Sequence, residues 1–245
     1  MAAPTREAGT PGGGDGTTSI AREPIARAGH WSWQASAGTA RCLFFGKPVE
    51  GSAEQDVLAE LERSGLEVAI LRQTHSRRVL EARPGDCGEG DALVSAHAGL
   101  ALRVVTADCV PVLLASATRI AAVHAGWRGL RAGIVGAAAR RLGADGACAA
   151  VIGPAIGGCC YEVGGDVAEE VAEEVGSRSV ILRPGDGPRP HLDLRLAARL
   201  ALEQAGVEAI TTIEACTRCD SSRLWSYRRD GRGAGRNLAF VWREP

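Results

Sequence analysis

Four short apolar segments follow one another in the middle of the chain, and they constrain the fold more than any other feature. Each is four to six residues long and rich in Val, Leu, Ile or Ala. Runs of this length and composition, separated by turn-sized gaps, are typical of buried strands. We therefore expect a sheet built from residues 91–94, 101–106, 110–115 and 120–123.

Other segments place further strands and several helices around this centre. Apolar spacing and glycine stop signals predict the helices, and Asp193 is positioned to cap the last of them. This mixture predicts an α+β fold, a single layered sandwich with mixed sheets. We expect strands at 42–45, 67–71, 149–152, 207–213 and 238–242, helices at 54–63, 129–142, 166–175 and 193–205, and a turn-rich loop at 83–90.

The beginning of the chain differs from the rest in composition. Residues 1–19 are rich in Gly, Thr and Pro and predict a disordered tail, whereas no linker divides residues 20–245, which we expect to form one catalytic domain. The tail lacks the basic start and apolar core of a signal peptide. We therefore expect a cytoplasmic protein, in which the eight cysteines are free thiols or metal ligands.

The overall charge argues against two classes of partner. The formal net charge is −1, so no global field favours nucleic acid or an anionic membrane surface. No apolar run is long enough to span a bilayer, because Arg103 and Asp108 interrupt the longest one. We expect no nucleic-acid partner and no membrane contact, and the sequence leaves the oligomeric state open.

Two histidines and one cysteine lie at the ends of predicted strands, inside unusual strings. His75 lies in QTHS, Cys109 in TADCVPV and His124 in VHAGWRG. Taken singly, each histidine is an ordinary polar residue and Cys109 an inert buried thiol. Together they could form a three-ligand metal site with an open fourth position, which is typical of catalytic zinc. Such a zinc lowers the pKa of its bound water to about 7.

Asp108 directly precedes the cysteine and adds to this interpretation. A buried carboxylate needs a partner, and a metal-bound histidine commonly donates its second N–H to one. A soft set of two imidazoles and one thiolate suits zinc better than copper. The chain has five histidines and no His-x-His pair, contrary to what a multicopper oxidase requires.

Arginines near the end of the chain are candidates for an anion site. Arg228 and Arg229 lie in SYRRDG, and Arg236 follows shortly after. The ordinary alternative is a solvated hairpin turn; the functional one is a phosphate contact. Arg128, next to Trp127, could place a guanidinium beside an aromatic surface for a base.

Two further pairs of cysteines have no clear chemical assignment. Cys216 and Cys219 form a lone CxxC, and the adjacent Cys159 and Cys160 do not have the spacing of a second zinc-ribbon pair. We interpret both pairs mainly as packing, with pocket lining as the lesser alternative.

Several of these strings together resemble one protein family. The strings QTHS, GDALVS, TADCVPVLLA, AAVHAGWRGL, IGPAIGGCCYEVG and CTRCDSSRLWSYRRDGRGAGR are similar to those of the peptidoglycan editing factor family. It is also called the purine nucleoside phosphorylase or laccase-domain family, formerly multicopper polyphenol oxidoreductase. The resemblance covers about residues 67–242. The segment before QTHS is shorter than in most members, which puts substrate choice in doubt more than metal binding.

The resemblance carries specific expectations. It implies a layered α/β sandwich similar to a toxin deamidase with a Cys/His site, and zinc held by His75, Cys109 and His124. It implies phosphorolysis of adenosine, inosine, guanosine or methylthioadenosine, and deamination of adenosine. Purine nucleoside and phosphate are then the partners, and bacterial members are linked to fidelity of cell-wall precursor synthesis.

Three hypotheses follow. In the first, a zinc-dependent purine nucleoside enzyme uses Asp108 as a proton shuttle and Arg128, Arg228 or Arg229 to hold phosphate. In the second, a metal-free cysteine hydrolase or amidase uses Cys109 as nucleophile and His75 or His124 as base. In the third, a non-catalytic binding protein regulates cell-wall or nucleotide metabolism. The sequence does not choose between phosphorolysis and deamination.

Overall fold

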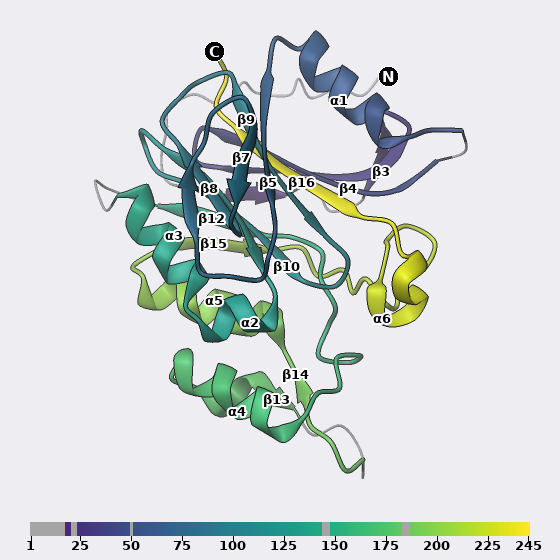
Figure 1. Ribbon diagram of the computed structural model, residues 1–245, viewed down its shortest axis with the longest axis vertical. Helices are drawn as coiled ribbons and strands as arrows, with labels where there is room; N and C mark the ends of the chain where they lie inside the picture. Colours follow the sequence, from purple (N-terminus) through teal and green to yellow (C-terminus); the bar gives the residue numbers. More distant parts are fainter. Residues whose placement is uncertain (1–17, 21–23, 50, 144–147, 183–186) are drawn as a thin grey trace, which may run out of the picture.

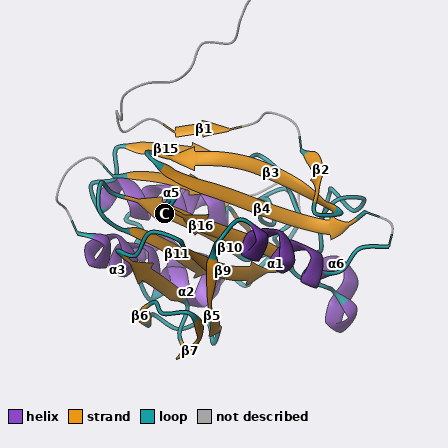
Figure 2. Ribbon diagram, turned by 90° about the horizontal axis from the view of Figure 1, so that it is seen from above, coloured by secondary structure: helices purple, strands orange, loops and turns teal. Residues whose placement is uncertain are grey.

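The computed structural model describes residues 18–20, 24–49, 51–143, 148–182 and 187–245. Two mixed sheets stack face to face, one helix covers the outer face of the first sheet, and a group of helices covers the outer face of the second (Figures 1 and 2). The predicted layered α+β sandwich with mixed sheets is confirmed. Within the described residues, no helix has both the length and the apolar character needed to cross a membrane.

The larger sheet has eight strands and includes the C-terminal strand in its middle. Its order is β1-β3-β4-β16-β9-β5-β7, with β2 paired to β3. Most neighbours are antiparallel, but β5 runs parallel to both β7 and β9. The strands are β1 (Thr18–Ile20), β2 (Ile25–Arg27), β3 (His30–Ala37), β4 (Ala40–Pro48), β5 (Glu67–Arg72), β7 (Gly85–Glu89), β9 (Leu100–Thr106) and β16 (Asn237–Trp242).

The smaller sheet has six strands, and every residue is buried in four of them. Its order is β15-β12-β10-β11-β8-β6, with parallel pairs at both edges and antiparallel pairs between them. Its strands are β6 (Val79–Glu81), β8 (Ala92–Ser95), β10 (Val110–Ala115), β11 (Ile120–Ala125), β12 (Ala149–Ile152) and β15 (Ala209–Thr212). Two shorter strands, β13 (Ile181–Leu182) and β14 (His191–Leu192), pair separately.

The side-chain alternation of the strands explains the layers. On β10, Val112 and Leu114 belong to the core shared with the helices, whereas Leu113 and Ala115 belong to the core between the two sheets. Successive side chains of a strand point to opposite faces, so a strand that is apolar on both faces must be covered on both. The unbroken apolar run from 110 to 115 is thus a consequence of its place in the middle of the sandwich.

The helices lie where their apolar faces meet a sheet. Helix α1 packs Val57 and Leu61 on the larger sheet, and the remaining long helices cover the smaller one (Figure 2). Asp193 caps α5 as predicted, because its carboxylate accepts from the N–H groups of Arg195 and Leu196. The helices are α1 (Glu54–Arg63), α2 (Trp127–Arg131), α3 (Ile134–Leu142), α4 (Gly165–Glu174), α5 (Leu194–Gln204) and α6 (Tyr227–Asp230), with 3-10 turns at Arg178–Val180 and Gly231–Gly233.

Two local predictions are wrong, and one strand was not predicted. The helix expected over 129–142 is two helices, because Gly133 adopts a φ of 76° and turns the chain between α2 and α3. The loop expected at 83–90 contains β7, which pairs with β5 despite its glycines. No strand is predicted around His30, yet His30–Ala37 forms β3, in which His30 itself is buried.

The predicted tail is only partly covered by the structure. Residues 1–17 lie outside the described part of the chain. Thr18 and Ser19, which the sequence analysis assigns to the tail, form β1 with Ile20 and pair with β3. The division into a tail and one catalytic domain stays a prediction.

Candidate metal centre

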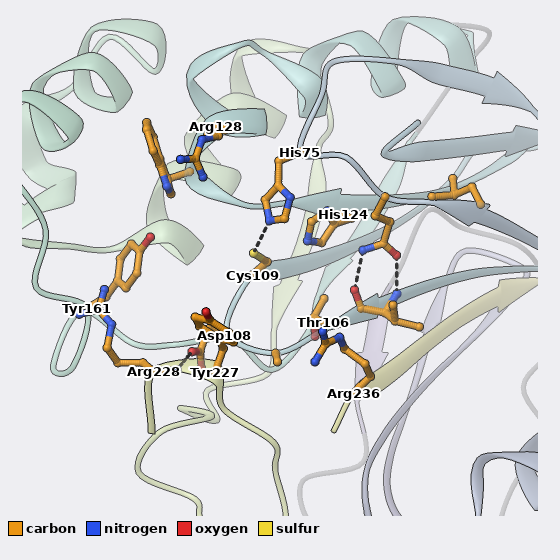
Figure 3. Close-up of a pocket in the computed structure, with 15 residues that line it drawn as sticks. His75, Thr106, Asp108, Cys109, His124, Arg128, Tyr161, Tyr227, Arg228 and Arg236 are labelled. Carbon is orange, nitrogen blue, oxygen red and sulfur yellow. Dashed lines mark hydrogen bonds between the residues drawn. The ribbon is translucent and has the colours of Figure 1, made fainter. Parts of the chain in front are cut away.

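His75, Cys109 and His124 converge at one edge of the sandwich. His75 follows β5, Cys109 precedes β10, and His124 lies near the end of β11. Because β10 and β11 are antiparallel, with Pro111 opposite His124, the residues at the start of β10 and the end of β11 are neighbours. Figure 3 shows the two imidazoles and the thiol turned toward one another.

The ligand atoms are close enough to share one ion. Nε2 of His75 lies 3.8 Å from Sγ of Cys109, and the two imidazole rings meet edge to face with centroids 4.8 Å apart. One nitrogen of each histidine and the sulfur all lie within 4.8 Å of one another. His75 is exposed, Cys109 half-buried and His124 buried, so the group borders solvent on one side. Its donor set fits a divalent ion with a free position.

A buried carboxylate that the sequence analysis did not assign holds two of these residues. Asp91 is fully buried, and its Oδ1 lies 2.8 Å from Nδ1 of His124. The same carboxylate accepts from the backbone N–H groups of His75 at 2.9 Å and Ser76 at 2.6 Å. These bonds hold the turn in which His75 has a φ of 59°. Asp91 thus orients both histidines.

The charges in the centre stabilise one another. Burial disfavours the Cys109 thiolate, but hydrogen bonds with His124 and His75 outweigh it and lower the pKa of Cys109 to about 6. Burial also disfavours the imidazolium of His124, yet its bonds to Asp91 and Cys109 raise its pKa to about 9. For Asp91 as well, the bonds from His124 and Ser76 outweigh burial and hold the pKa below its usual range. Without metal, Cys109 and His124 therefore form a thiolate–imidazolium pair at neutral pH.

Among the described residues, Asp108 does not partner a histidine, contrary to the expectation from sequence. Its carboxylate accepts from the Thr217 hydroxyl at 2.6 Å and from the backbone N–H of Arg228 at 2.6 Å. The expectation failed because Asp108, with a φ of 89°, directs its side chain away from Cys109 toward the C-terminal loop. The role of Asp108 as a proton shuttle stays a prediction.

The three ligands border a cavity of about 660 Å³. Arg128 and Arg228 line it, as does Arg236, and each guanidinium of the first two lies against an aromatic ring. The Arg128 guanidinium is 4.5 Å from the ring centroid of Trp127, and the Arg228 guanidinium is 5.0 Å from the ring centroid of Tyr161. Burial raises the pKa of Tyr161 to about 12, so its hydroxyl stays protonated. The cavity thus combines cations, aromatic faces and a metal-type donor set (Figure 3).

Arg229 is not among the residues that line the cavity. Its guanidinium donates to the carbonyl oxygens of Thr217, at 2.8 Å, and Leu224, at 2.8 Å, and pairs with Asp230. These bonds brace the loop that carries α6. The structure thus brings Arg128 and Arg228 to the cavity but directs Arg229 into the loop.

Sequence reasoning missed several lining residues. Thr106 is buried at the cavity, and its hydroxyl has no hydrogen-bond partner among the described residues. Gln73 bonds the backbone of Val105 in both directions and so holds the end of β5 against β9. Gln73 and Thr106 begin the strings QTHS and TADC, and Tyr161 lies in IGPAIGGCCYEVG, but membership in these strings did not indicate that the residues line the cavity.

Comparisons with known proteins show the family to which the chain belongs. The family model for the multi-copper polyphenol oxidoreductase laccase matches residues 51–244, and the chain belongs to that family. A purine nucleoside phosphorylase of Pseudomonas aeruginosa is 40% identical over 74% of this chain and 76% of its own. One of Streptomyces coelicolor is 46% identical over 71% and 74%. An adenosine deaminase from an unknown prokaryotic organism is 34% identical over 73% and 76%.

Solved structures give the same result. YlmD of Geobacillus stearothermophilus superposes with a TM-score of 0.74 at 28% identity, covering 86% of this chain and 96% of that one. Protein NMB0706 of Neisseria meningitidis gives 0.72 at 29% identity, covering 84% and 95%. The family resemblance seen in the sequence is confirmed, and the chain is an enzyme.

Proposed function

We propose that this chain is a zinc-dependent purine nucleoside phosphorylase whose site also supports deamination of adenosine. The observation that carries the proposal is the three-ligand centre opening into a cavity lined by Arg128 and Arg228. A catalytic zinc keeps a position free for chemistry, and a phosphate requires cationic partners. The names of the curated relatives, purine nucleoside phosphorylase and adenosine deaminase, support both reactions.

The residues around the centre fit zinc better than copper. A thiolate and two imidazoles form a soft, mixed donor set. The bond from Nδ1 of His124 to Asp91 leaves Nε2 as its ligand atom. When bound, zinc supplies a Lewis acid and an activated water.

In phosphorolysis, the cavity residues would bind and orient the two substrates. Arg128 and Arg228 would hold phosphate, and the rings of Trp127 and Tyr161 offer apolar faces for the purine. A phosphate oxygen attacks C1′ of the ribose as the bond from C1′ to the base nitrogen breaks, and the electron pair leaves with the base, which takes up a proton. The Thr106 hydroxyl, which has no hydrogen-bond partner in the part of the chain that the structure describes, would hydrogen-bond a polar group of the substrate.

The test follows both products in one experiment. Zinc-loaded protein is incubated with adenosine in the presence and absence of phosphate, and adenine, ribose 1-phosphate and inosine are measured. Phosphorolysis predicts adenine and ribose 1-phosphate only with phosphate, whereas deamination predicts inosine in both mixtures. Cys109→Ala should abolish both reactions. Zinc-loaded protein that turns over none of adenosine, inosine, guanosine or methylthioadenosine would contradict the proposal.

Arg228→Ala tests the phosphate site. Losing a charged hydrogen bond costs about 1.5–3 kcal/mol, which corresponds to roughly a tenfold to hundredfold rise in the KM for phosphate. Arg232→Ala is the matched control, because Arg232 is exposed on the same loop and does not line the cavity. It should leave this KM unchanged.

One observation favours a second function. Sγ of Cys109 lies within reach of both imidazoles, 3.8 Å from Nε2 of His75, and hydrogen bonds with the rings lower the pKa of the thiol. A metal-free cysteine hydrolase or amidase would use this arrangement, here toward cell-wall precursors. Bound zinc protects the thiolate from alkylation and so separates the two functions. Hydrolysis of an amide substrate by protein that has been stripped of metal would favour the hydrolase.

A further inference from the structure

Four cysteines that are distant in the sequence form a second thiol group. Cys159 and Cys160 follow β12, and Cys216 and Cys219 follow β15. These strands are parallel neighbours, so the loops leave the same edge of the sheet. An isolated bridge between Ala155 and Cys216 extends the pairing to the cysteines themselves. The fold therefore supplies the second pair of ligands that the sequence spacing did not indicate.

The sulfur separations match those around a single tetrahedral ion. Sγ of Cys159 lies 3.7 Å from that of Cys160, 3.7 Å from that of Cys216 and 3.8 Å from that of Cys219. Cys160 and Cys219 are 3.4 Å apart, and all four sulfurs lie within 4.8 Å of one another. A tetrahedron with zinc–sulfur bonds of about 2.3 Å has edges of about 3.8 Å. A disulfide would instead bring two sulfurs to about 2.05 Å.

The backbone around the group is also arranged for thiolates. The N–H of Gly157 points at Sγ of Cys216, at 3.2 Å, and such bonds stabilise negative charge on sulfur. A Cβ on Gly157 would lie 3.1 Å from Sγ of Cys159, so a glycine here lets the backbone of residue 157 approach the four sulfurs without a steric conflict. No lysine, arginine or histidine is among the residues that form hydrogen bonds to these sulfurs within the described chain.

We propose that Cys159, Cys160, Cys216 and Cys219 bind one structural zinc ion as four thiolates. Four protein ligands close the coordination shell, so this ion holds the two loops together and performs no chemistry. Binding releases the thiol protons to solvent and transfers no electron. This site is separate from the His75, Cys109 and His124 centre and does not depend on the proposed nucleoside chemistry.

The site would support one wall of the cavity. Cys160 directly precedes Tyr161 in the chain, and the Tyr161 ring lines the cavity and contacts Arg228. Thr217, between the two cysteines of the CxxC, holds Asp108 through its hydroxyl and donates its N–H to Ala155. Both loops that carry these residues would be fixed to each other by the ion.

The test measures coordination rather than turnover. A Cys109→Ala/His124→Ala protein, purified with zinc under reducing conditions and desalted, should retain about one zinc per chain. X-ray absorption at the zinc edge should give four sulfur neighbours at about 2.3 Å. The wild type should hold about two ions, Cys216→Ser/Cys219→Ser about one, and the control Cys87→Ser about two.

Several results would contradict the proposal. A Cys109→Ala/His124→Ala protein without zinc, or with zinc bound by nitrogen or oxygen, would overturn it, as would disulfides among the four cysteines seen by mass spectrometry. If that variant fails to fold, the wild type decides, because two ions with the proposed ligands give about five sulfur and two nitrogen neighbours in total. A single zinc with one sulfur would then refute the second site.

Discussion

The carboxylate of Asp91 lies 2.8 Å from Nδ1 of His124, and this contact determines which nitrogen of the imidazole faces Cys109. The same carboxylate accepts hydrogen bonds from the backbone N–H groups of Thr74, His75 and Ser76. One buried charge therefore holds a ring on β11 and a turn after β5. Because the turn and the ring belong to different sheets, Asp91 also sets the distance between the two histidines.

Asp91→Asn should weaken metal binding more than it disturbs the fold. The amide keeps the size of the carboxylate, but one of the two acceptor oxygens becomes an NH2 group, so the donors at that position lose their acceptor. Loss of such an orienting partner typically reduces metal affinity by about tenfold to a hundredfold. Competition with a chromophoric chelator measures the affinity, and thermal unfolding measures the stability.

Asp86→Asn is the control for this substitution. Asp86 is exposed and pairs with Arg72 at the surface, where an ion pair contributes about 0–1 kcal/mol. It should leave the zinc affinity at the wild-type value. Equal affinities for the Asp91→Asn protein and the wild type would show that Asp91 does not orient the ligands.

The three candidate ligands were predictable from sequence, whereas the contacts that bring them together were not. His75, Cys109 and His124 each follow or begin an apolar strand in a distinctive string, so local pattern located them. Asp91 was quoted only as part of a family string, because its partners lie in other strands and no spacing reveals them. Asp108 was misassigned for the converse reason: adjacency to Cys109 in sequence does not fix the direction of a side chain at a positive φ.

The same distinction between local pattern and long-range contacts explains which parts of the fold could be predicted. Strands such as β10 and β12 were predicted with their observed bounds because they are apolar on both faces. Strand β7 was missed since its residues, GDCGE, carry no apolar pattern and depend on pairing with β5. The cysteine pairs were interpreted as packing because their proximity arises only from the parallel pairing of β12 and β15.

Alkylation of Cys109 in metal-free protein should rise with a midpoint near pH 6. The pKa of this thiol is lowered to about 6, so the reactive thiolate is present above that pH and is lost as the pH falls through it. His124, with a pKa raised to about 9, stays an imidazolium across this range. The midpoint is the readout, because a thiolate of low pKa is intrinsically a weaker nucleophile.

Mass spectrometry of the labelled peptide separates Cys109 from the other cysteines. His75→Gln removes one of the hydrogen bonds to the thiolate, so its midpoint should move upward. Added zinc should suppress labelling of Cys109 in the wild type. A wild-type midpoint near 8.5, the value of an ordinary cysteine, would refute the stabilised thiolate.

Gly126→Ala should reduce metal binding through sterics alone. A Cβ at this position would lie 2.9 Å from Sγ of Cys109 and 2.9 Å from Cδ2 of His75, so both ligands would have to move apart. The backbone φ of −76° suits alanine, and the fold should tolerate the change. We expect the zinc affinity to fall by about tenfold to a hundredfold, as when ligand positioning is lost.

Gly165→Ala is the matched control. Its added Cβ meets no atom within 4 Å, and Gly165 is the first residue of α4. It should gain about 0.4–1 kcal/mol of stability from the reduced freedom of the unfolded chain and leave zinc binding unchanged. If Gly126→Ala binds zinc as tightly as this control, the side chains of His75 and Cys109 do not approach Gly126 closely in the metal-bound protein.

Thr106→Val should impair substrate binding without destabilising the protein. Valine keeps the branched shape of threonine, and the Thr106 hydroxyl has no partner to lose among the described residues. Because an unsatisfied buried hydroxyl costs free energy, the free energy of unfolding should be unchanged or larger. A hydrogen bond to substrate contributes about 0.5–1.5 kcal/mol, so the KM for nucleoside or phosphate should rise roughly twofold to tenfold. Thr106→Ser keeps the hydroxyl and should keep the wild-type KM. A Thr106→Val protein with unchanged kinetics would mean that this hydroxyl does not contact the substrate.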